Sequence, residues 1–184
     1  MAEMTVAEVG AVPERVGGGT PLVQFITNYV AMNFAANAVI ASGGAPAMVH
    51  AAEEAEDFAR IASAPTIAIG TISPPWVEGR LAAIGGAEAA GRPWVLDPVA
   101  VGATPCRTEV AARLRERGPR AIRGNASEIL ALSGAAAAGH GVDAGDTVEA
   151  AARALRLAVE AGRAGGRSVS SDEASDKASD EVRA

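Results

Sequence analysis

Polar side chains that could bind a charged ligand stand at the ends of short apolar runs. Asp97 ends the run that begins at Trp94, and Arg123 ends the run that begins at Ala121. A carboxylate can hold Mg²⁺ directly or through water, and a guanidinium can bind phosphate oxygens. If these runs are parallel strands of one sheet, their carboxyl ends share the edge at which such sheets bind ligands. The spacing therefore predicts a polyanion site at that edge.

The same residues also have structural interpretations. Asp97 can close a strand-end turn by accepting hydrogen bonds from nearby amides. The small-residue loop at 102–104 opens a predicted helix whose free N–H groups favour an anion. Thr104 as N-cap, with Pro105 at the first helical position, explains the same sequence without a ligand. Both interpretations can hold at once.

The densest polar cluster is the segment at 123–128, which reads RGNASE. Glu128 lies one turn inside a predicted helix, from where it could face a metal ion through water. Alternatively, Asn125 and Glu128 form a capping box, which stabilises a helix start without any role in catalysis. The spacing is the same in both cases, so both interpretations remain open.

Other candidate residues have weaker signals. Asn33 and Asn37 are four residues apart in a helical segment and share a face, where they could bind a polar ligand or only satisfy backbone carbonyls. Met48 fits the core or the apolar wall of a ligand pocket. We expect His50 to be structural rather than catalytic. Cys106 has no evident base partner, so we do not expect a nucleophile there.

Strand-sized apolar runs alternate with helical patterns about five times along the chain. The runs are apolar at consecutive positions, which favours a parallel sheet covered by helices on both faces. The predicted fold class is therefore α/β. The predicted strands are 22–27, 47–50, 66–70, 94–97 and 121–123.

The two ends of the chain differ in composition from this body. Residues 1–19 end in three glycines and predict a flexible segment. The α/β domain is expected over residues 20–161, where the last helix carries an apolar stripe from Val148 to Val159. Residues 162–184 are rich in serine and acidic side chains and predict a disordered tail.

Composition and charge exclude several classes of protein. Lys and Arg number 16 against 22 Asp and Glu, and the net charge of −6 argues against a nucleic-acid partner. Residues 25–49 carry no charge, but three asparagines and a Ser-Gly-Gly-Ala-Pro break argue against a membrane span. The single cysteine fits a reducing compartment, and the acidic N-terminus does not resemble a secretory signal. We therefore expect a cytoplasmic protein.

Four blocks of the sequence together resemble the hydroxyethylthiazole kinase family of the thiamine pathway. They read PLVQFITNYV at 21–30, GAPAM at 44–48, WVLDPVAVGA at 94–103 and AIRGNASEI at 121–129. The resemblance implies a ribokinase-like fold and transfer of the ATP γ-phosphoryl group to the alcohol of 4-methyl-5-(2-hydroxyethyl)thiazole, with Mg²⁺. It also implies a homotrimer with sites between subunits.

The resemblance also assigns roles to individual residues by their position in these blocks. Three sets follow from it: Met48, Asn28 and Asn33 at the thiazole, Arg123 and Asn125 at ATP, and Asp97 and Glu128 at the magnesium ion. The argument from strand ends reaches the same edge of the sheet without the resemblance. Phosphoryl transfer suits such a site, since it needs positioning and charge neutralisation more than covalent chemistry.

The sequence departs from the family pattern after the last predicted helix. Family members continue with a strand ending in a Val-Thr-Gly-like segment and with a Gly-x-Gly-Cys-like loop that serves the transferring phosphoryl group, and neither is found here. No catalytic residue is therefore assigned. We expect a C-terminal truncation or a shifted reading frame near residue 160. The alternative function is a non-catalytic remnant that binds the thiazole or assembles with intact subunits.

Overall fold

The structure, a computed structural model, describes residues 11–134. Two units are described separately, one ending at Gly124 and one beginning at Asn125. The strands of the first unit are β1 (Leu22–Ile26), β2 (Ala45–Ala47), β3 (Ala64–Ala68), β4 (Val95–Asp97) and β5 (Ala121–Ile122). Its helices are α2 (Val12–Gly19), α3 (Tyr29–Ala41), α4 (Ala52–Ile61), α5 (Pro74–Ala89) and α6 (Pro105–Glu116). The second unit contributes α7 (Ala126–Ser133).

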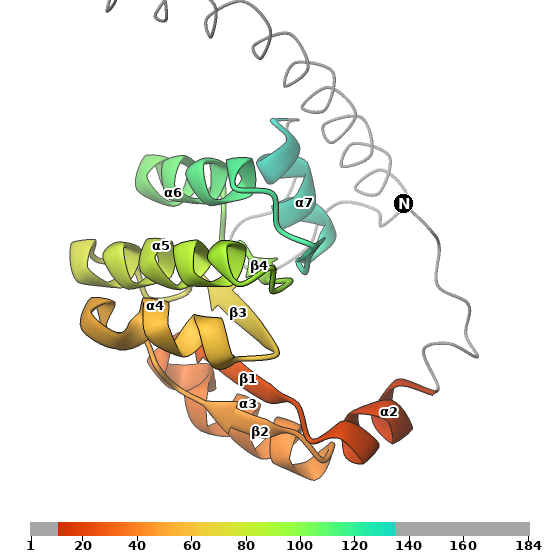
Figure 1. Cartoon of the computed structure of the whole chain (residues 1–184). Helices are drawn as coiled ribbons and strands as arrows, with labels where there is room; N and C mark the ends of the chain where they lie inside the picture. Colours follow the sequence, from red (N-terminus) through yellow and green to blue (C-terminus); the bar gives the residue numbers. More distant parts are fainter. Residues whose placement is uncertain (1–10, 135–184) are drawn as a thin grey trace, which may run out of the picture. The chain divides into compact units, whose positions relative to one another are not determined.

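The five strands form one parallel sheet in the order β2-β1-β3-β4-β5. Figure 1 labels the first four of these strands. The parallel sheet confirms the predicted α/β class. The chain moves from β1 to one side of the sheet and then crosses back to β3, so the topological switch point lies between β1 and β3. Open sheets of this type bind ligands at the switch point, beyond the carboxyl ends of the strands.

Helices α4 and α5 pack closely together over one face of the sheet (Figure 1). Glycines make the close approach possible: a Cβ at Gly79 would lie 2.0 Å from the His50 carbonyl oxygen, and one at Gly86 would lie 2.2 Å from that of Glu56. The strand side chains on the buried face include Ile67 and Leu96, which have no solvent exposure. This interface is the main described core of the first unit.

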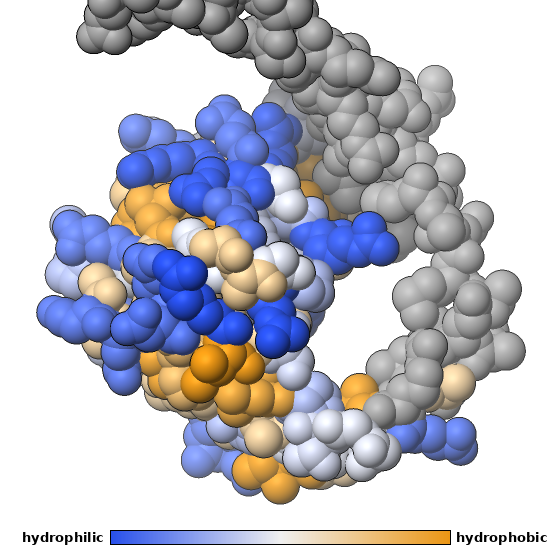
Figure 2. Space-filling model, in the orientation of Figure 1, coloured by the Kyte–Doolittle hydropathy of each residue, from blue (hydrophilic) through white to orange (hydrophobic). Residues whose placement is uncertain are grey.

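Helix α3 contrasts with α4 and α5, because none of its residues is buried. Right-handed crossovers place α3 on the sheet face opposite α4 and α5. Its apolar side chains reach the surface, with Val30 at 93% and Phe34 at 80% exposure. Apolar side chains are also visible at the surface where α3 and β2 lie (Figure 2). Within residues 11–134, no helix is both long and apolar enough to cross a bilayer.

Three elements differ from the sequence-based expectation. Strand β3 occupies Ala64–Ala68 rather than 66–70. Strand β2 occupies Ala45–Ala47 rather than 47–50, and it includes Pro46, which pairs with Val23 in register. Proline is tolerated there because β2 lies at the edge of the described sheet. The segment predicted to be flexible over residues 1–19 contains α2 in its described part, which begins with a proline in its first turn. The predicted helix at 148–159 and the tail at 162–184 lie outside the described residues.

Candidate active site

The carboxyl edge of the sheet collects most of the predicted site residues. Because all five strands run parallel, the residues that follow them meet at one edge. In order along this edge they are Met48 after β2, Asn28 after β1, Gly70 and Thr71 after β3, Asp97 at the end of β4, and Arg123 after β5.

Asp97 and Arg123 form a salt bridge at this edge, in which an Arg123 Nη1 donates to Asp97 Oδ2. The carboxylate is largely buried, with 12% of the side chain exposed, whereas the Arg123 side chain is 79% exposed. The backbone N–H of Arg123 also donates to the Leu96 carbonyl oxygen at 2.9 Å. The sheet therefore holds a guanidinium whose open side faces solvent, which is suited to binding an anion such as a phosphate group.

Asn28 combines a structural contact with a position at the switch point. Its Oδ1 accepts a hydrogen bond of 2.8 Å from the N–H of Ala31, so Asn28 is the N-cap of α3. On its other side the amide packs against Gly70, where an added Cβ would lie 2.5 Å from Asn28 Nδ2. The amide is thereby held between the start of α3 and the loop after β3.

The loop after β3 is held by two arginines that the sequence analysis did not single out. Arg80 of α5 donates to the carbonyl oxygens of Ala68 and Thr71. Arg107 of α6 donates to the carbonyl oxygens of Ile69 and Gly70, at 2.8 and 2.9 Å. An arginine directly before the apolar run LAAI of α5 was the available sequence signal for the first of them.

Gln24 supports the neighbouring loop after β2 in a similar way, and the sequence analysis missed it as well. This side chain is fully buried in β1, and its Nε2 donates to the carbonyl oxygens of Val49 and Ala55 at 3.0 and 3.2 Å. It thus ties the segment that follows Met48 to the start of α4. An amide within the apolar run LVQFI was the signal that could have revealed it.

Asn33 lies on α3, where its side chain and that of Asn37 are exposed. Asn37 Nδ2 donates to the Asn33 backbone oxygen at 2.9 Å and to Asn33 Oδ1 at 3.0 Å. The expected shared face is therefore present, and the two amides bind each other there. Neither amide is buried inside the fold.

Asn125 and Glu128 form the capping box that begins α7 in the second unit. Asn125 Oδ1 accepts from the N–H of Glu128 at 2.8 Å, and Glu128 Oε2 accepts from the N–H of Asn125 at 2.9 Å. Thr104 is likewise the N-cap of α6, since its Oγ1 accepts a hydrogen bond from the N–H of Arg107. The structural interpretations of both segments are thus confirmed.

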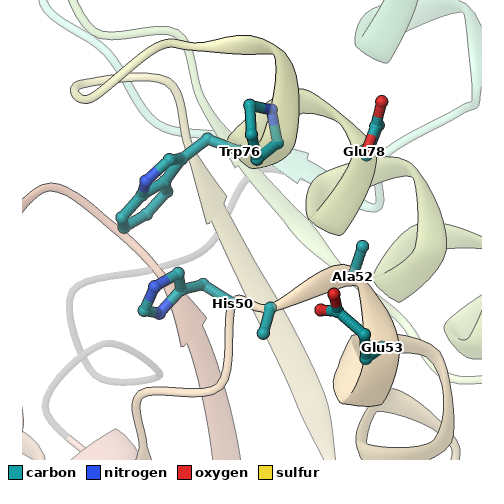
Figure 3. A pocket seen from close by; sticks show the side chains of 7 residues that line it. His50, Ala52, Glu53, Trp76 and Glu78 are labelled. Atoms are coloured by element: carbon teal, nitrogen blue, oxygen red, sulfur yellow. The ribbon is translucent and has the colours of Figure 1, made fainter.

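His50 and Trp76 line a pocket of about 230 Å³ between the starts of α4 and α5 (Figure 3). Their rings are stacked, with centroids 4.2 Å apart and an angle of 12° between the planes. Tyr29 contacts Trp76 edge-on at 5.3 Å. Cys106 is free and exposed. Within residues 11–134, no cluster of three or more His, Cys, Asp or Glu side chains could hold a metal ion.

A parallel sheet carries an Asp–Arg pair and the Asn28 amide at its carboxyl edge. These features define the class of the protein: α/β proteins in which small polar ligands bind at this edge. The model of the hydroxyethylthiazole kinase family matches residues 14–174, so the chain belongs to this family.

Individual relatives agree with this assignment. The chain is 60% identical over 154 residues to a hydroxyethylthiazole kinase of Cereibacter sphaeroides, covering 83% of this chain and 59% of that protein. It is 58% identical over 144 residues to a hydroxyethylthiazole kinase of Rhizobium johnstonii, covering 78% and 54%. The structure of a hydroxyethylthiazole kinase from Pyrococcus horikoshii aligns with a TM-score of 0.65 at 45% identity, covering 67% of this chain and 48% of that one. The chain thus spans about half the length of these relatives.

Proposed function

We propose that the protein transfers the γ-phosphoryl group of ATP to the hydroxyl of 4-methyl-5-(2-hydroxyethyl)thiazole. The observation that carries this proposal is the Asp97–Arg123 pair at the carboxyl edge of the sheet, in a chain that belongs to the hydroxyethylthiazole kinase family. Asn28 at the switch point lies on the same edge. A nucleotide half and a thiazole half of the site would therefore share one rim of the first unit.

Each half has a distinct task in this reaction. Phosphoryl transfer through a loose transition state depends on positioning and on neutralising the charge of the phosphate oxygens. We assign the exposed Arg123 guanidinium to the ATP phosphates, with Asn125 as a further ATP-binding residue. We assign Met48, Asn28 and Asn33 to the thiazole, which they would hold with its hydroxyl toward the nucleotide.

Magnesium is the metal that we propose for this site, because a carboxylate lies beside the proposed phosphate position. Mg²⁺ is usually bound through one or two carboxylates together with substrate phosphates, and it keeps several of its waters. The carboxylate of Asp97 provides an oxygen donor beside the proposed phosphate site. Glu128 belongs to the second unit, and we assign it to the magnesium ion from the resemblance to the family alone. Bound with ATP, the ion would neutralise charge on the phosphates, while Asp97 would also hold Arg123 in place.

The direct test is an incubation of the purified chain with Mg-ATP and the thiazole alcohol, followed by mass spectrometry. We expect phosphorylated thiazole and ADP in equal amounts, and less product from Arg123→Gln. Absence of product at high protein concentration would contradict the proposal. If the thiazole alcohol nevertheless raised the melting temperature, the alternative of a non-catalytic thiazole-binding remnant would replace it.

We further propose that the chain assembles as a homotrimer, as its resemblance to the family implies. The supporting observation is α3, whose apolar side chains Val30 and Phe34 are exposed in the single chain. Exposed apolar patches of this kind mark interaction surfaces. A cytoplasmic location is part of the same proposal, because the reaction consumes ATP and the lone Cys106 suits a reducing compartment.

A further inference from the structure

Four consecutive carbonyl oxygens, from the last residue of β3 into the loop that follows it, each accept a hydrogen bond from an arginine. Arg80 takes the first and the last: its Nε donates to Ala68 at 2.8 Å and its Nη2 donates to Thr71. Arg107 takes the two between them, through Nη1 to Ile69 and Nη2 to Gly70. Every carbonyl group in the segment 68–71 is thereby fixed by a guanidinium.

Arg80 is buried and Arg107 is half-buried, and neither has a carboxylate partner within residues 11–134. Among the described residues neither takes part in a salt bridge, and Arg80 has no solvent exposure. Burial and the nearby charge of Arg107 lower the pKa of Arg80 to about 10, so its guanidinium stays charged at neutral pH. The Trp76 ring, 5.4 Å from the guanidinium carbon, offers further compensation. Burying the Arg80 charge near that of Arg107 is costly, and the hydrogen bonds to the backbone carbonyl oxygens offset this cost.

The segment that these arginines hold lies at the topological switch point. Gly70 packs against Asn28, since a Cβ at this glycine would lie 2.5 Å from Asn28 Nδ2 and 2.8 Å from Asn28 Cβ. Arg107 Nη1 also donates to the Val99 carbonyl oxygen at 3.0 Å, two residues beyond Asp97. The same guanidinium therefore links the loop after β3 to the loop after β4.

We propose that Arg80 and Arg107 are positioning residues of the thiazole half of the site. They fix the backbone of residues 68–71, and Gly70 in turn fixes the place of the Asn28 amide. The arginines do not touch the ligand; they act through the loop. The identity of the ligand in this inference rests on the proposed function. The link from the arginines to Asn28 rests only on the hydrogen bonds and the packing described above.

The first arm of the test needs no ligand. The side-chain amide resonance of Asn28 is identified in the ¹⁵N-labelled full chain as the signal lost in Asn28→Asp. We expect Arg107→Met to move this signal and Arg107→Lys to move it less, because lysine keeps a charged donor. Arg113→Met, an exposed change on the same helix α6, is the control and leaves the signal in place. A folded Arg107→Met protein with an unmoved Asn28 signal would overturn the inference.

The second arm measures thiazole affinity by calorimetry. We expect Arg107→Met to weaken binding of the thiazole alcohol by at least about tenfold, with partial rescue in Arg107→Lys, while Arg113→Met stays within about twofold. If Arg107→Met does not fold, Gly70→Ala replaces it, because this variant keeps both arginines and pushes on Asn28 directly. An unmoved Asn28 signal in Gly70→Ala would also overturn the inference. A wild-type chain that binds no thiazole refutes the proposed function, and the first arm then decides the arginine link separately.

Discussion

At the scale of single residues, the candidate site consists of groups that serve the fold and that we propose to contact a ligand. Arg123 is anchored through its backbone N–H to β4 and through its guanidinium to Asp97, and most of its side chain remains exposed. Asn28 caps α3 with one end of its amide and contacts Gly70 with the other. Because of this double use, a substitution at either residue can affect both stability and ligand binding, so both must be measured.

Removing the guanidinium of Arg123 should weaken nucleotide binding selectively. A hydrogen bond to a charged group contributes about 1.5 to 3 kcal/mol, so we expect Arg123→Gln to reduce Mg-ATP affinity by about 10- to 100-fold. Thiazole affinity should remain within about twofold of the wild type, because the two halves of the site use different residues. Calorimetric titration with each ligand measures both effects. Arg120→Gln, an exposed change three residues earlier, is the control, and equal ATP affinity in both variants would contradict the assignment.

Replacing Arg80 should destabilise the folded chain by an amount that does not depend on pH near neutrality. Arg80→Met leaves the carbonyl oxygens of Ala68 and Thr71 without their donors, at a cost on the order of 2 to 4 kcal/mol in the free energy of unfolding. The pKa of Arg80, lowered to about 10 by burial and by Arg107, keeps the group charged between about pH 6 and 8.5. Above about pH 10, the folded chain releases this proton before the unfolded chain does, so the stability contribution of Arg80 rises there.

Urea unfolding of the wild type and of Arg80→Met at several pH values measures this difference. The exposed change Arg92→Met serves as the control and should alter stability by less than about 0.5 kcal/mol. A difference between wild type and Arg80→Met that grows steadily from about pH 6 to 8.5 would show that Arg80 is not charged as described.

At the scale of elements, glycine spacing on α5 decides how closely α4 and α5 pack. The carbonyl groups of His50 and Glu56 occupy the space that side chains at Gly79 and Gly86 would need. Gly85 is the neighbour of Gly86, and a Cβ added at Gly85 would have open space around it. The close packing keeps α4, and with it the loop after β2, against the start of α5.

Alanine substitutions on α5 should therefore have opposite effects at neighbouring positions. A Cβ at position 86 would lie 2.2 Å from a backbone oxygen, so we expect Gly86→Ala to destabilise the chain by about 1 to 3 kcal/mol. Gly85→Ala should stabilise it by about 0.5 to 1 kcal/mol, because alanine restricts the unfolded chain and nothing opposes its methyl group. Urea unfolding of the two variants checks this. Similar losses at both positions would contradict the described packing.

Much of the element pattern could be predicted from the sequence, and the reasons for the exceptions are physical. Apolar runs located β1, β3, β4 and β5, because buried parallel strands are apolar at consecutive positions. The predicted bounds of β2 were wrong because proline is typical of turns, which excluded Pro46 from the predicted strand. An edge strand nevertheless tolerates a proline. The capping box of Asn125 and Glu128 could be predicted because these residues are only three positions apart in the sequence. The contacts of Arg80 and Arg107 were not, since they join residues 9 to 38 positions apart through backbone carbonyls that no side-chain pattern reveals.

At the scale of the whole molecule, the largest group of exposed apolar side chains within residues 11–134 lies on α3. No residue of this helix is buried, although its composition is strongly apolar. Phe34 and Val30 are the side chains that gain most from being covered, since burial of a large apolar side chain contributes about 1.5 to 3 kcal/mol. A further copy of the chain is the cover that the proposed homotrimer supplies.

A charge on this face should disrupt assembly. We expect Phe34→Glu to shift the mass measured by multi-angle light scattering from that of a trimer to that of a single chain. Ile61→Glu, the same kind of change at an exposed apolar residue of α4, should leave the mass unchanged. A wild-type chain that is monomeric at high concentration, or a trimer that persists in Phe34→Glu, would contradict the role of α3.

The central claim is that one edge of the sheet binds both ligands, and chemical-shift mapping on the ¹⁵N-labelled full chain tests it most directly. Addition of the thiazole alcohol should move the backbone amides of Asn28 and Gly70, and addition of Mg-ADP should move those of Asp97 and Arg123. The amides at the opposite ends of the same strands, such as those of Leu22 and Val95, should remain in place. Movement confined to those opposite ends, or none at saturating ligand, would contradict the account.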